Sequence, residues 1–540
     1  MISALTWIRK GAAQHTPDRF KLTDEEYANI AAQIGAEVDV AKEELAEAEA
    51  AAAQGESAEE MEVDEEAPAK KEKGDDELAE YNLDTYDDEE EQGQKDIPIF
   101  GNVKGLTYYG SNQEDPYIVV KDEEDDEQEL EEMAISPNEN LLLAAKTEDE
   151  ISHVEVYVYE AEEDNLYVHH DIMLPSFPLC LEWLDFPVGK KAGKQERGNF
   201  VAIGTFDPEV EIWDLDTVDA VYPSQILGGA PNPTLRLGAD PIKKKKAGPA
   251  RTAKHPNSDR HVDAVMSIAW NKHHRHMIAT GSADTTVKLW DLNNPEKAAR
   301  SFGVHKNKVQ AVAWNSTEPT ALLTGGYDKR ACVFDTRAPA NVLEWKLSAD
   351  VECMRWDPFH GEKFYVSSED GLVKCFDVRA ASKEPLWTLH AHDAAVSALD
   401  VCPTMDGLLV TGSADKQAKL WNIKEGKPSC LASRDLGVGK IFAANFSVDT
   451  PYILSVAGSK GKVLIWNLED NAGVRKAFPS MQHTGAPSAA PRKELLTVDS
   501  DEEDEDEDEE AGPAGDDAMD GDEGWNEDEA EEEDSDGDHV

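Results

Sequence analysis

The stretch Gly281-Ser-Ala-Asp-Thr-Thr-Val-Lys-Leu-Trp-Asp-Leu-Asn293 decides the fold of this chain. It opens with a turn signal at Gly281–Asp284, because glycine and aspartate adopt the backbone angles that tight turns require. The residues that follow alternate as in a β-strand, which directs Lys288 away from the two apolar residues beside it. The stretch therefore predicts a turn and then a strand that ends at Trp290 and Asp291.

Copies of this pattern recur along the chain. The clearest have a turn signal followed by an aromatic residue and Asp or Asn: Gly325–Asp328 with Phe334, Ser368–Asp370 with Phe376, and Gly412–Asp415 with Trp421, and degenerate copies end at Trp213 and Trp466. From Trp290 onward the aromatic residues are 44, 42, 45 and 45 residues apart. A period of about 40–45 residues with this ending is typical of four-stranded propeller blades. The sequence thus predicts an all-β, seven-bladed WD-repeat β-propeller.

Strands can be assigned to each of the seven blades. The predicted first blade contains Leu130–Ile135, Asn140–Ala145, Val154–Tyr159 and Leu166–Leu174, and the others begin near Leu179, Val262, Val309, Val351, Val396 and Ile441. A strand from one chain end is expected to close the ring. The candidate is Tyr117–Val120, and the competing choice is Val474–Phe478.

The charge of the chain is concentrated in two segments. The 540 residues have a net charge of −60. Residues 31–100 contain 25 acidic and 5 basic residues, and residues 501–540 contain 24 acidic and no basic residues. Such segments cannot bury enough apolar surface to offset the entropy of ordering, so disordered acidic extensions are predicted.

The composition and the repeats together predict four regions. They are an N-terminal docking peptide or short helix at 1–30, an acidic disordered linker at 31–99, the propeller at 100–479 with a basic insertion at 229–260, and a disordered linker and acidic tail at 480–540. The helix is expected around Leu22–Ile30, where Thr23 and Glu26 have capping-box spacing. An aromatic pair at Tyr81 and Tyr86 fits a second docking peptide or a chance occurrence in a disordered linker.

Several classes of function are disfavoured by the residues. The six cysteines show no metal-binding or paired spacing, and no apolar run approaches the ~18 residues of a membrane span. The N-terminus does not have the pattern of a secretory signal. Phosphate-loop, zinc-protease and nucleophile-elbow motifs are absent from the sequence. We therefore expect no enzyme activity, cofactor, metal, membrane association or small-molecule substrate.

The repeats contain a polar set that has two interpretations. Histidine, aspartate and a hydroxyl residue together resemble a nucleophilic triad. Because the set is copied in several blades, a buried structural network is favoured instead. The residues assigned to it are His261, Asp284, Trp290, His305, Asp328, His392, Asp415 and Trp421.

Two basic stretches and two serines are further candidates. The first stretch contains Lys190, Lys191 and Lys194, and the insertion contains Lys243, Lys244, Lys245, Lys246, Arg251 and Lys254. Each fits a nuclear localisation signal, an RNA phosphate contact or a solubilising loop. Ser500 and Ser535 precede acidic residues. This pattern suits phosphorylation by an acidophilic kinase, but any serine in an acidic tail has the same surroundings.

Four stretches are unusual for WD repeats: Met1–Ile8, Tyr81–Asp87, Asn102–Gly110 and Tyr167–Trp183. In these stretches the chain resembles the periodic tryptophan protein 1 family, and the similarity extends from residue 1 to about 470. The resemblance implies a nuclear, nucleolar factor that associates with pre-ribosomal proteins and assembly factors. It also implies a role in maturation of large-subunit precursor rRNA and a connection to chromatin at ribosomal RNA genes. The acidic segments match the family only in their acidic composition, and no individual residue can be matched there.

These observations lead to three hypotheses. The first is a non-catalytic scaffold in ribosome biogenesis that contacts pre-ribosomal proteins and precursor rRNA. The second is a histone- or chromatin-binding protein that regulates ribosomal RNA gene transcription, since acidic tails attract basic histone tails. The third is a substrate adaptor of a cullin ubiquitin ligase, because Phe334–Arg337 and Phe376–Arg379 resemble the WDxR box of such adaptors. An ion pair of each arginine with its own blade is the alternative for these two motifs.

Overall fold

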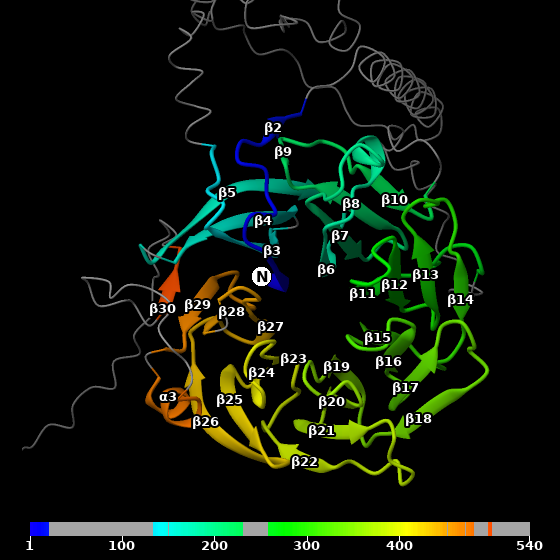
Figure 1. The fold of residues 1–540 in the computed structure, drawn as a ribbon, viewed down its shortest axis with the longest axis vertical. Coiled ribbons are helices and arrows are strands. Elements are labelled where there is room, and N and C mark those ends of the chain that lie inside the picture. Colours follow the sequence, from blue (N-terminus) through cyan, green and yellow to red (C-terminus); the bar gives the residue numbers. More distant parts are fainter. Residues whose placement is uncertain are drawn as a thin grey trace, which may run out of the picture. The chain divides into compact units, whose positions relative to one another are not determined.

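Seven four-stranded antiparallel sheets are arranged around a common axis in the computed structural model (Figure 1). The structure describes residues 1–20, 133–229, 257–479 and 495–498, apart from the single residues 150, 162, 451 and 470. The predicted seven-bladed β-propeller is therefore confirmed. The inner strands of neighbouring blades are in contact all around the ring.

Blades 3 to 6 have the strands that the repeat predicts. Blade 3 consists of β11 (Val265–Trp270), β12 (Met277–Ser282), β13 (Val287–Asp291) and β14 (Arg300–Phe302). Blade 4 consists of β15 (Val309–Trp314), β16 (Ala321–Gly326), β17 (Arg330–Asp335) and β18 (Val342–Lys346). Blade 5 consists of β19 (Val351–Trp356), β20 (Lys363–Ser368), β21 (Leu372–Asp377) and β22 (Trp387–His390). Blade 6 consists of β23 (Ala398–Val401), β24 (Leu408–Gly412), β25 (Gln417–Lys424) and β26 (Lys427–Asp435).

Blade 2 departs from this pattern in its loops. Its strands are β6 (Pro178–Leu184), β7 (Phe200–Thr205), β8 (Val210–Asp214) and β10 (Gln225–Leu227). The loop between β6 and β7 contains the short helix η3 (Gly189–Lys191). Outside the sheet, β9 (Thr217–Val218) pairs in parallel with β2 (Asp18–Arg19), which ties the N-terminal segment to blade 2.

The inner strand of blade 1 comes from the N-terminus of the sequence. It is β1 (Ile2–Ile8), which pairs with β3 (Asn140–Glu148), followed by β4 (Ile151–Glu160) and β5 (Asn165–Leu174). The prediction that residues 1–30 form a docking peptide is wrong for this part. The predicted first strand, Leu130–Ile135, is also wrong at its described end, because Ile135 lies outside the sheet and its N–H donates to the carbonyl of His15 (2.8 Å).

A β-bulge shows that β1 is equivalent to the other inner strands. In six of the seven blades the register between the inner and the second strand shifts near the start of the inner strand. In β1 the shift falls between Ile2 and Ala4, and in β11 it falls between Val265 and Ser267. A bulge places one extra residue and increases the local twist. Residues 2–8 thus have the geometry of an ordinary blade.

Blade 7 is completed by a C-terminal segment. Its strands are β27 (Ile441–Phe446), β28 (Ile453–Gly458), β29 (Val463–Asn467) and β30 (Leu495–Thr497). The competing prediction for ring closure, Val474–Phe478, is wrong because α3 (Ala472–Ala477) covers most of it, with Asn471 capping its first turn. Leu495–Thr497 was predicted to belong to a disordered linker and instead pairs with β29.

The core lies between blades as well as within them. Ile2, Leu5 and Trp7 of β1 pack against Ile453 and neighbouring apolar residues of blade 7, and all of these are buried. The Trp7 indole N–H donates to the carbonyl of Asn445 in blade 7 (3.1 Å). Burial of apolar area on both faces of each sheet drives this arrangement.

Several predictions lie outside the described residues. They concern the helix near Leu22–Ile30, the strand Tyr117–Val120, the Tyr81–Tyr86 segment, residues 230–256 of the basic insertion and both acidic extensions.

Candidate functional site

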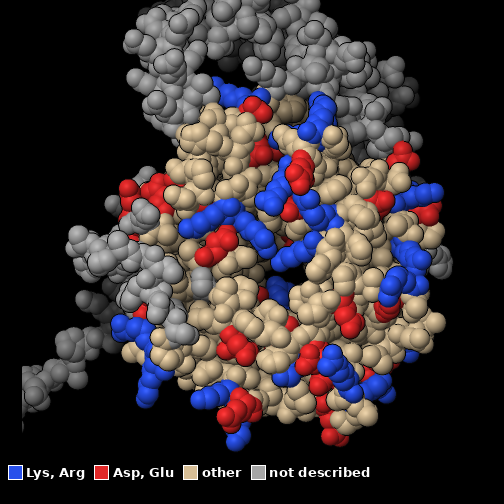
Figure 2. Space-filling view, viewed as in Figure 1, with Lys and Arg blue, Asp and Glu red and all other residues tan. Residues whose placement is uncertain are grey.

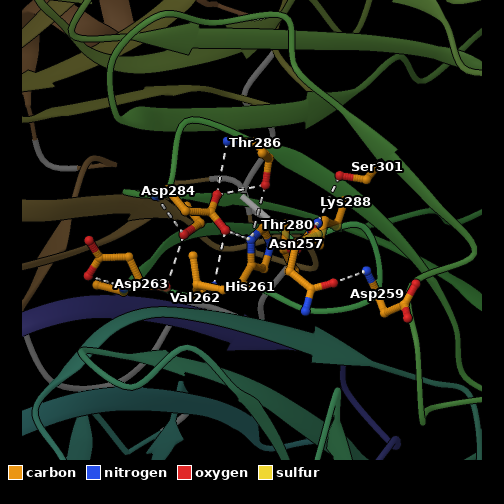
Figure 3. Close-up of polar contacts among 12 residues, drawn as sticks. Asn257, Asp259, His261, Val262, Asp263, Thr280, Asp284, Thr286, Lys288 and Ser301 are labelled. Carbon is orange, nitrogen blue, oxygen red and sulfur yellow. Dashed lines mark hydrogen bonds and ion pairs between the residues drawn. The ribbon is translucent and has the colours of Figure 1, made fainter. Parts of the chain in front are cut away.

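The polar network of blade 3 joins strands β12 and β13, the turn between them and the loop before β11 (Figure 3). His261 lies between two partners: its Nδ1 is 2.9 Å from Oδ2 of Asp284, and its Nε2 is 2.7 Å from Oγ1 of Thr280. The indole N–H of Trp290 donates to the same Thr280 oxygen at 2.9 Å. The predicted set His261, Asp284 and Trp290 is thus brought together, with Thr280 as the shared hydroxyl.

Asp284 also organises the turn between β12 and β13. Its carboxylate accepts hydrogen bonds from the backbone N–H of Val262 (3.2 Å) and Thr286 (2.9 Å) and from the Thr286 hydroxyl (2.6 Å). Burial alone would raise the pKa of Asp284, but hydrogen bonds from His261 and Thr286 outweigh it and lower the pKa to about 2. Burial lowers the pKa of His261, against the opposing effect of Asp284. The pair is therefore an ionised carboxylate beside a neutral imidazole at neutral pH.

The same arrangement recurs in blades 4 and 6, as predicted. His305 lies 3.0 Å from Asp328 and 2.9 Å from the hydroxyl of Thr324. In blade 6 the corresponding bonds are His392–Asp415 (2.8 Å), His392–Thr411 (2.8 Å) and Trp421–Thr411 (2.9 Å). Blade 4 has Phe334 in place of the tryptophan, and Arg330 supplies a further donor to Asp328 (2.6 Å). Three copies of one network indicate a structural element of the blades.

The chemistry available to this network is limited by burial. The order hydroxyl, imidazole and carboxylate matches that of a nucleophilic triad. However, Thr280 has no exposed surface and His261 is 1% exposed, so a substrate cannot approach the hydroxyl without opening the blade. Each donor and acceptor is satisfied within the protein, as buried polar groups require. The network fastens the loop before β11 to the second and third strands.

Acid should weaken this fastening in a predictable pH range. The pKa of Asp284 is about 2 in the folded protein and about 3.8 when unfolded, so its carboxylate stabilises the fold above pH 4. This contribution is lost as the pH falls from 4 toward 2. We expect the stability difference between wild type and Asp284→Asn, measured by urea unfolding, to shrink by about 2 kcal/mol between pH 6 and pH 2.

The control for this prediction is Asp393→Asn, which removes one negative charge at an exposed position. A difference between wild type and Asp284→Asn that stays constant with pH would contradict the assigned role of the carboxylate.

A buried lysine accompanies the network and was not predicted. Lys288 of β13 has no exposed surface, although the alternation only placed it on the opposite side of the strand from its apolar neighbours. Its Nζ donates to the carbonyl of Asn257 and to Oγ of Ser301 (2.8 Å) (Figure 3). Burial lowers the pKa of Lys288. The lysine thereby holds Asn257, in the segment before β11, against the outer part of blade 3.

The predicted basic residues of blade 2 divide into two groups. Lys191, in η3, is 2.7 Å from Oδ2 of Asp214 and 3.8 Å from Oδ2 of Asp216, so its charge is used within the blade. Lys190 and Lys194 are exposed. The candidates Lys243, Lys244, Lys245, Lys246, Arg251 and Lys254, together with Ser500 and Ser535, lie outside the described residues.

One histidine–aspartate group has the spacing of a metal site. Asp357, His360 and Asp406 place their ligand atoms within 4.8 Å of one another. The Asp357 carboxylate, however, already accepts hydrogen bonds from the backbone N–H of Phe359 (2.9 Å) and from the Tyr365 hydroxyl (2.8 Å). These bonds hold the loop between β19 and β20, which accounts for the position of Asp357 without a cation.

The two arginines that resemble a ligase-binding motif differ in their partners. Arg337 forms an ion pair with Asp335 of its own blade (2.8 Å), in agreement with the alternative interpretation of this motif. For Arg379 the described contact is its backbone N–H, which donates to Oδ1 of Asp377 (2.8 Å).

Comparison with known proteins places the chain among WD-repeat proteins. Residues 256–291, 296–335 and 383–422 match the family model described as WD domain, G-beta repeat. The chain is 36% identical over 534 residues to periodic tryptophan protein 1 of Saccharomyces cerevisiae, covering 89% of this chain and 90% of the relative. It is 31% identical over 488 residues to the periodic tryptophan protein 1 homolog of Drosophila melanogaster, covering 88% and 96%.

A third relative is an uncharacterized WD repeat-containing protein of Schizosaccharomyces pombe, 42% identical over 488 residues, with 89% and 91% covered. In the described part of the chain, no helix has the length and apolar character needed to span a membrane.

Proposed function

Because this chain belongs to the periodic tryptophan protein 1 family, we propose that it is a non-catalytic scaffold in ribosome biogenesis. In this role it acts in the nucleus and nucleolus on pre-large-subunit particles, where it contacts pre-ribosomal proteins, assembly factors and precursor rRNA. The observation that carries the proposal is the identity of 31–36% to two family members over nearly 90% of the chain. A ring of seven packed sheets suits this role, since it presents a rigid surface to several partners at once.

Depletion of the protein tests the proposal directly. We expect the tagged protein to co-sediment with pre-large-subunit particles on a sucrose gradient and to concentrate in the nucleolus by fluorescence microscopy. Acute depletion should cause unprocessed large-subunit precursor rRNA to accumulate, measured by northern blotting, and re-expression of the wild-type chain should reverse the effect. Normal processing after depletion would rule out this function.

Histone binding is a second candidate, favoured by the acidic composition. Residues 501–540 contain 24 acidic and no basic residues, which suits basic histone tails. Removal of residues 499–540 separates the two candidates. A scaffold that binds particles through its propeller should still co-sediment after this removal. If both co-sedimentation and histone binding are lost, the chromatin role is favoured.

A further inference from the structure

Three loops that follow the inner strands of blades 1, 2 and 3 form a continuous part of the surface. They are residues 9–17, 185–199 and 271–276. Arg275 ties the third loop to the second, because its Nε lies 2.6 Å from Oδ1 of Asp185 and its guanidinium also donates to two backbone carbonyl groups of that loop. The inner strands of these blades are themselves in contact, so the loops lie at the same end of the ring.

The first loop is joined to blade 2 through a shared carboxylate. The backbone N–H of Gln14 donates to Oδ1 of Asp216 at 3.0 Å. The Nζ of Lys191 lies 3.8 Å from the other oxygen of the same carboxylate. Asp214 and Asp216 are both largely buried, so these acidic groups neutralise internal charges and contribute little negative surface.

The exposed charges of the three loops are mostly positive. Loops 9–17 and 271–276 contain no acidic residue, and loop 185–199 contains two, of which Asp185 is paired with Arg275. The exposed basic side chains are Arg9, Lys190, Lys194, Arg197 and Lys272, and we call this set the basic face. Figure 2 shows Lys and Arg side chains gathered around the central opening, mainly in the upper half of the view, where blades 1 and 2 lie.

Two features of the basic face match a nucleic-acid backbone. Arg9, Lys194, Arg197 and Lys272 form no ion pair with a carboxylate of the described chain, so their charges remain available for phosphate groups. His273 and His274 lie beside Lys272 with exposed rings, and aromatic rings of this kind stack on unpaired bases. In a chain with a net charge of −60, a local positive surface also orients an anionic partner toward this end of the ring.

We propose that the basic face binds the phosphate backbone of single-stranded RNA. The inference rests on the proposed function, because pre-ribosomal particles supply RNA as the abundant anionic partner. It adds to that function the face of the ring and the residues that contact RNA. The phosphate groups would lie along Lys194 and Arg197 of blade 2 and continue to Arg9 on one side and Lys272 on the other.

The test measures salt-dependent RNA binding by the full-length chain. The probe is a fluorescently labelled 30-nucleotide single-stranded RNA, followed by anisotropy at several KCl concentrations. The variant carries Arg9→Glu, Lys194→Glu, Arg197→Glu and Lys272→Glu. Each lost phosphate contact lowers the slope of log K against log salt by about 0.7, so the slope should fall by roughly 3.

A matched control carries the same change in charge on loops at the other ends of the strands: Lys306→Glu, Lys308→Glu, Lys440→Glu and Lys460→Glu, all exposed. The control should keep the wild-type slope, and both variants should keep the wild-type unfolding temperature. If the fourfold variant does not fold, Lys194→Glu with Arg197→Glu alone should lower the slope by roughly 1.4.

Three outcomes would overturn the inference. They are an unchanged slope in the variant, an equal loss in the control, and a wild-type chain that binds labelled polyglutamate more tightly than RNA, which would indicate an acidic protein partner. The result is independent of the test of the proposed function, since an unchanged slope would refute the basic face while leaving the scaffold role, which is tested by co-sedimentation and rRNA processing, intact.

Discussion

A chain that lacks residues 2–9 is expected to lose its cooperative unfolding transition under conditions in which the wild type is folded. Residues 2–8 of this segment form β1, the inner strand of blade 1. Ile2, Leu5, Trp7 and Ile8 are each at most 6% exposed. At about 1.5–3 kcal/mol for each buried side chain, their loss removes roughly 6–12 kcal/mol. This is comparable with the ~5–15 kcal/mol that stabilises a typical protein.

The measurement is thermal unfolding followed by far-ultraviolet circular dichroism. A synthetic peptide of residues 1–12, added in excess, should restore the transition, because binding to the folded form alone raises its stability. A scrambled peptide of the same composition is the control. An unfolding temperature equal to that of the wild type in the shortened chain would show that β1 does not close the ring.

Replacement of Trp290 by alanine is expected to lower the free energy of unfolding by about 3–5 kcal/mol. Trp290 is 1% exposed and packs with apolar residues of blades 2 and 3, so alanine leaves a cavity between two blades. The substitution also removes the indole donor from Thr280, although His261 still bonds to that hydroxyl. Urea unfolding of both proteins gives the difference from the shift of the midpoint.

Trp290→Phe is the matched control for this prediction. Phenylalanine occupies the corresponding position as Phe334 in blade 4 and Phe376 in blade 5, and both are buried. It keeps most of the ring volume and loses one hydrogen bond, so a cost of about 1 kcal/mol is expected. Equal losses for Ala and Phe would mean that the hydrogen bond, and not the packing, stabilises the blade.

The repeat alone was sufficient to predict blades 3 to 6 and the polar networks of blades 3, 4 and 6. The reason is that turn, alternation and aromatic residue are all local, and each blade repeats them at nearly constant spacing. His261, Asp284 and Trp290 could be assigned before the structure because buried polar groups need fixed partners in every copy. Thr280, Thr324 and Thr411, whose hydroxyls bond the histidines of these networks, occupy equivalent positions in the second strands of their blades.

The composition of blades 1 and 7 could not be predicted from the period, because their missing strands come from distant parts of the chain. A signal for β1 was nevertheless present. Ala4-Leu-Thr-Trp7 has the same form as Cys180-Leu-Glu-Trp183 and Ser267-Ile-Ala-Trp270, which lie in the inner strands of blades 2 and 3. Comparison of the inner-strand tryptophans, in addition to those of the third strands, would have identified residues 2–8 as part of the ring.

Burial of individual charges was the least predictable property. Alternation assigned Lys288 a side of its strand but gave no indication that the side chain would be enclosed by Asn257 and Ser301. Likewise, Lys190, Lys191 and Lys194 are indistinguishable in sequence, yet Lys191 is half-buried and pairs with Asp214, whereas Lys190 and Lys194 are exposed. Such differences depend on contacts between loops, which periodicity does not describe.

The hydrogen bond from the Trp7 indole to the Asn445 carbonyl can form only late in synthesis of the protein on the ribosome. The two residues are 438 positions apart. At roughly 5–20 residues per second, between about 20 and 90 s pass before the second partner has been made. Throughout that interval the apolar side chains of β1 that pack on blade 7 are uncovered on that side, and exposed apolar surface of this kind promotes aggregation. Burial of Ile2, Leu5 and Trp7 against blade 7 is therefore completed only when translation reaches that blade.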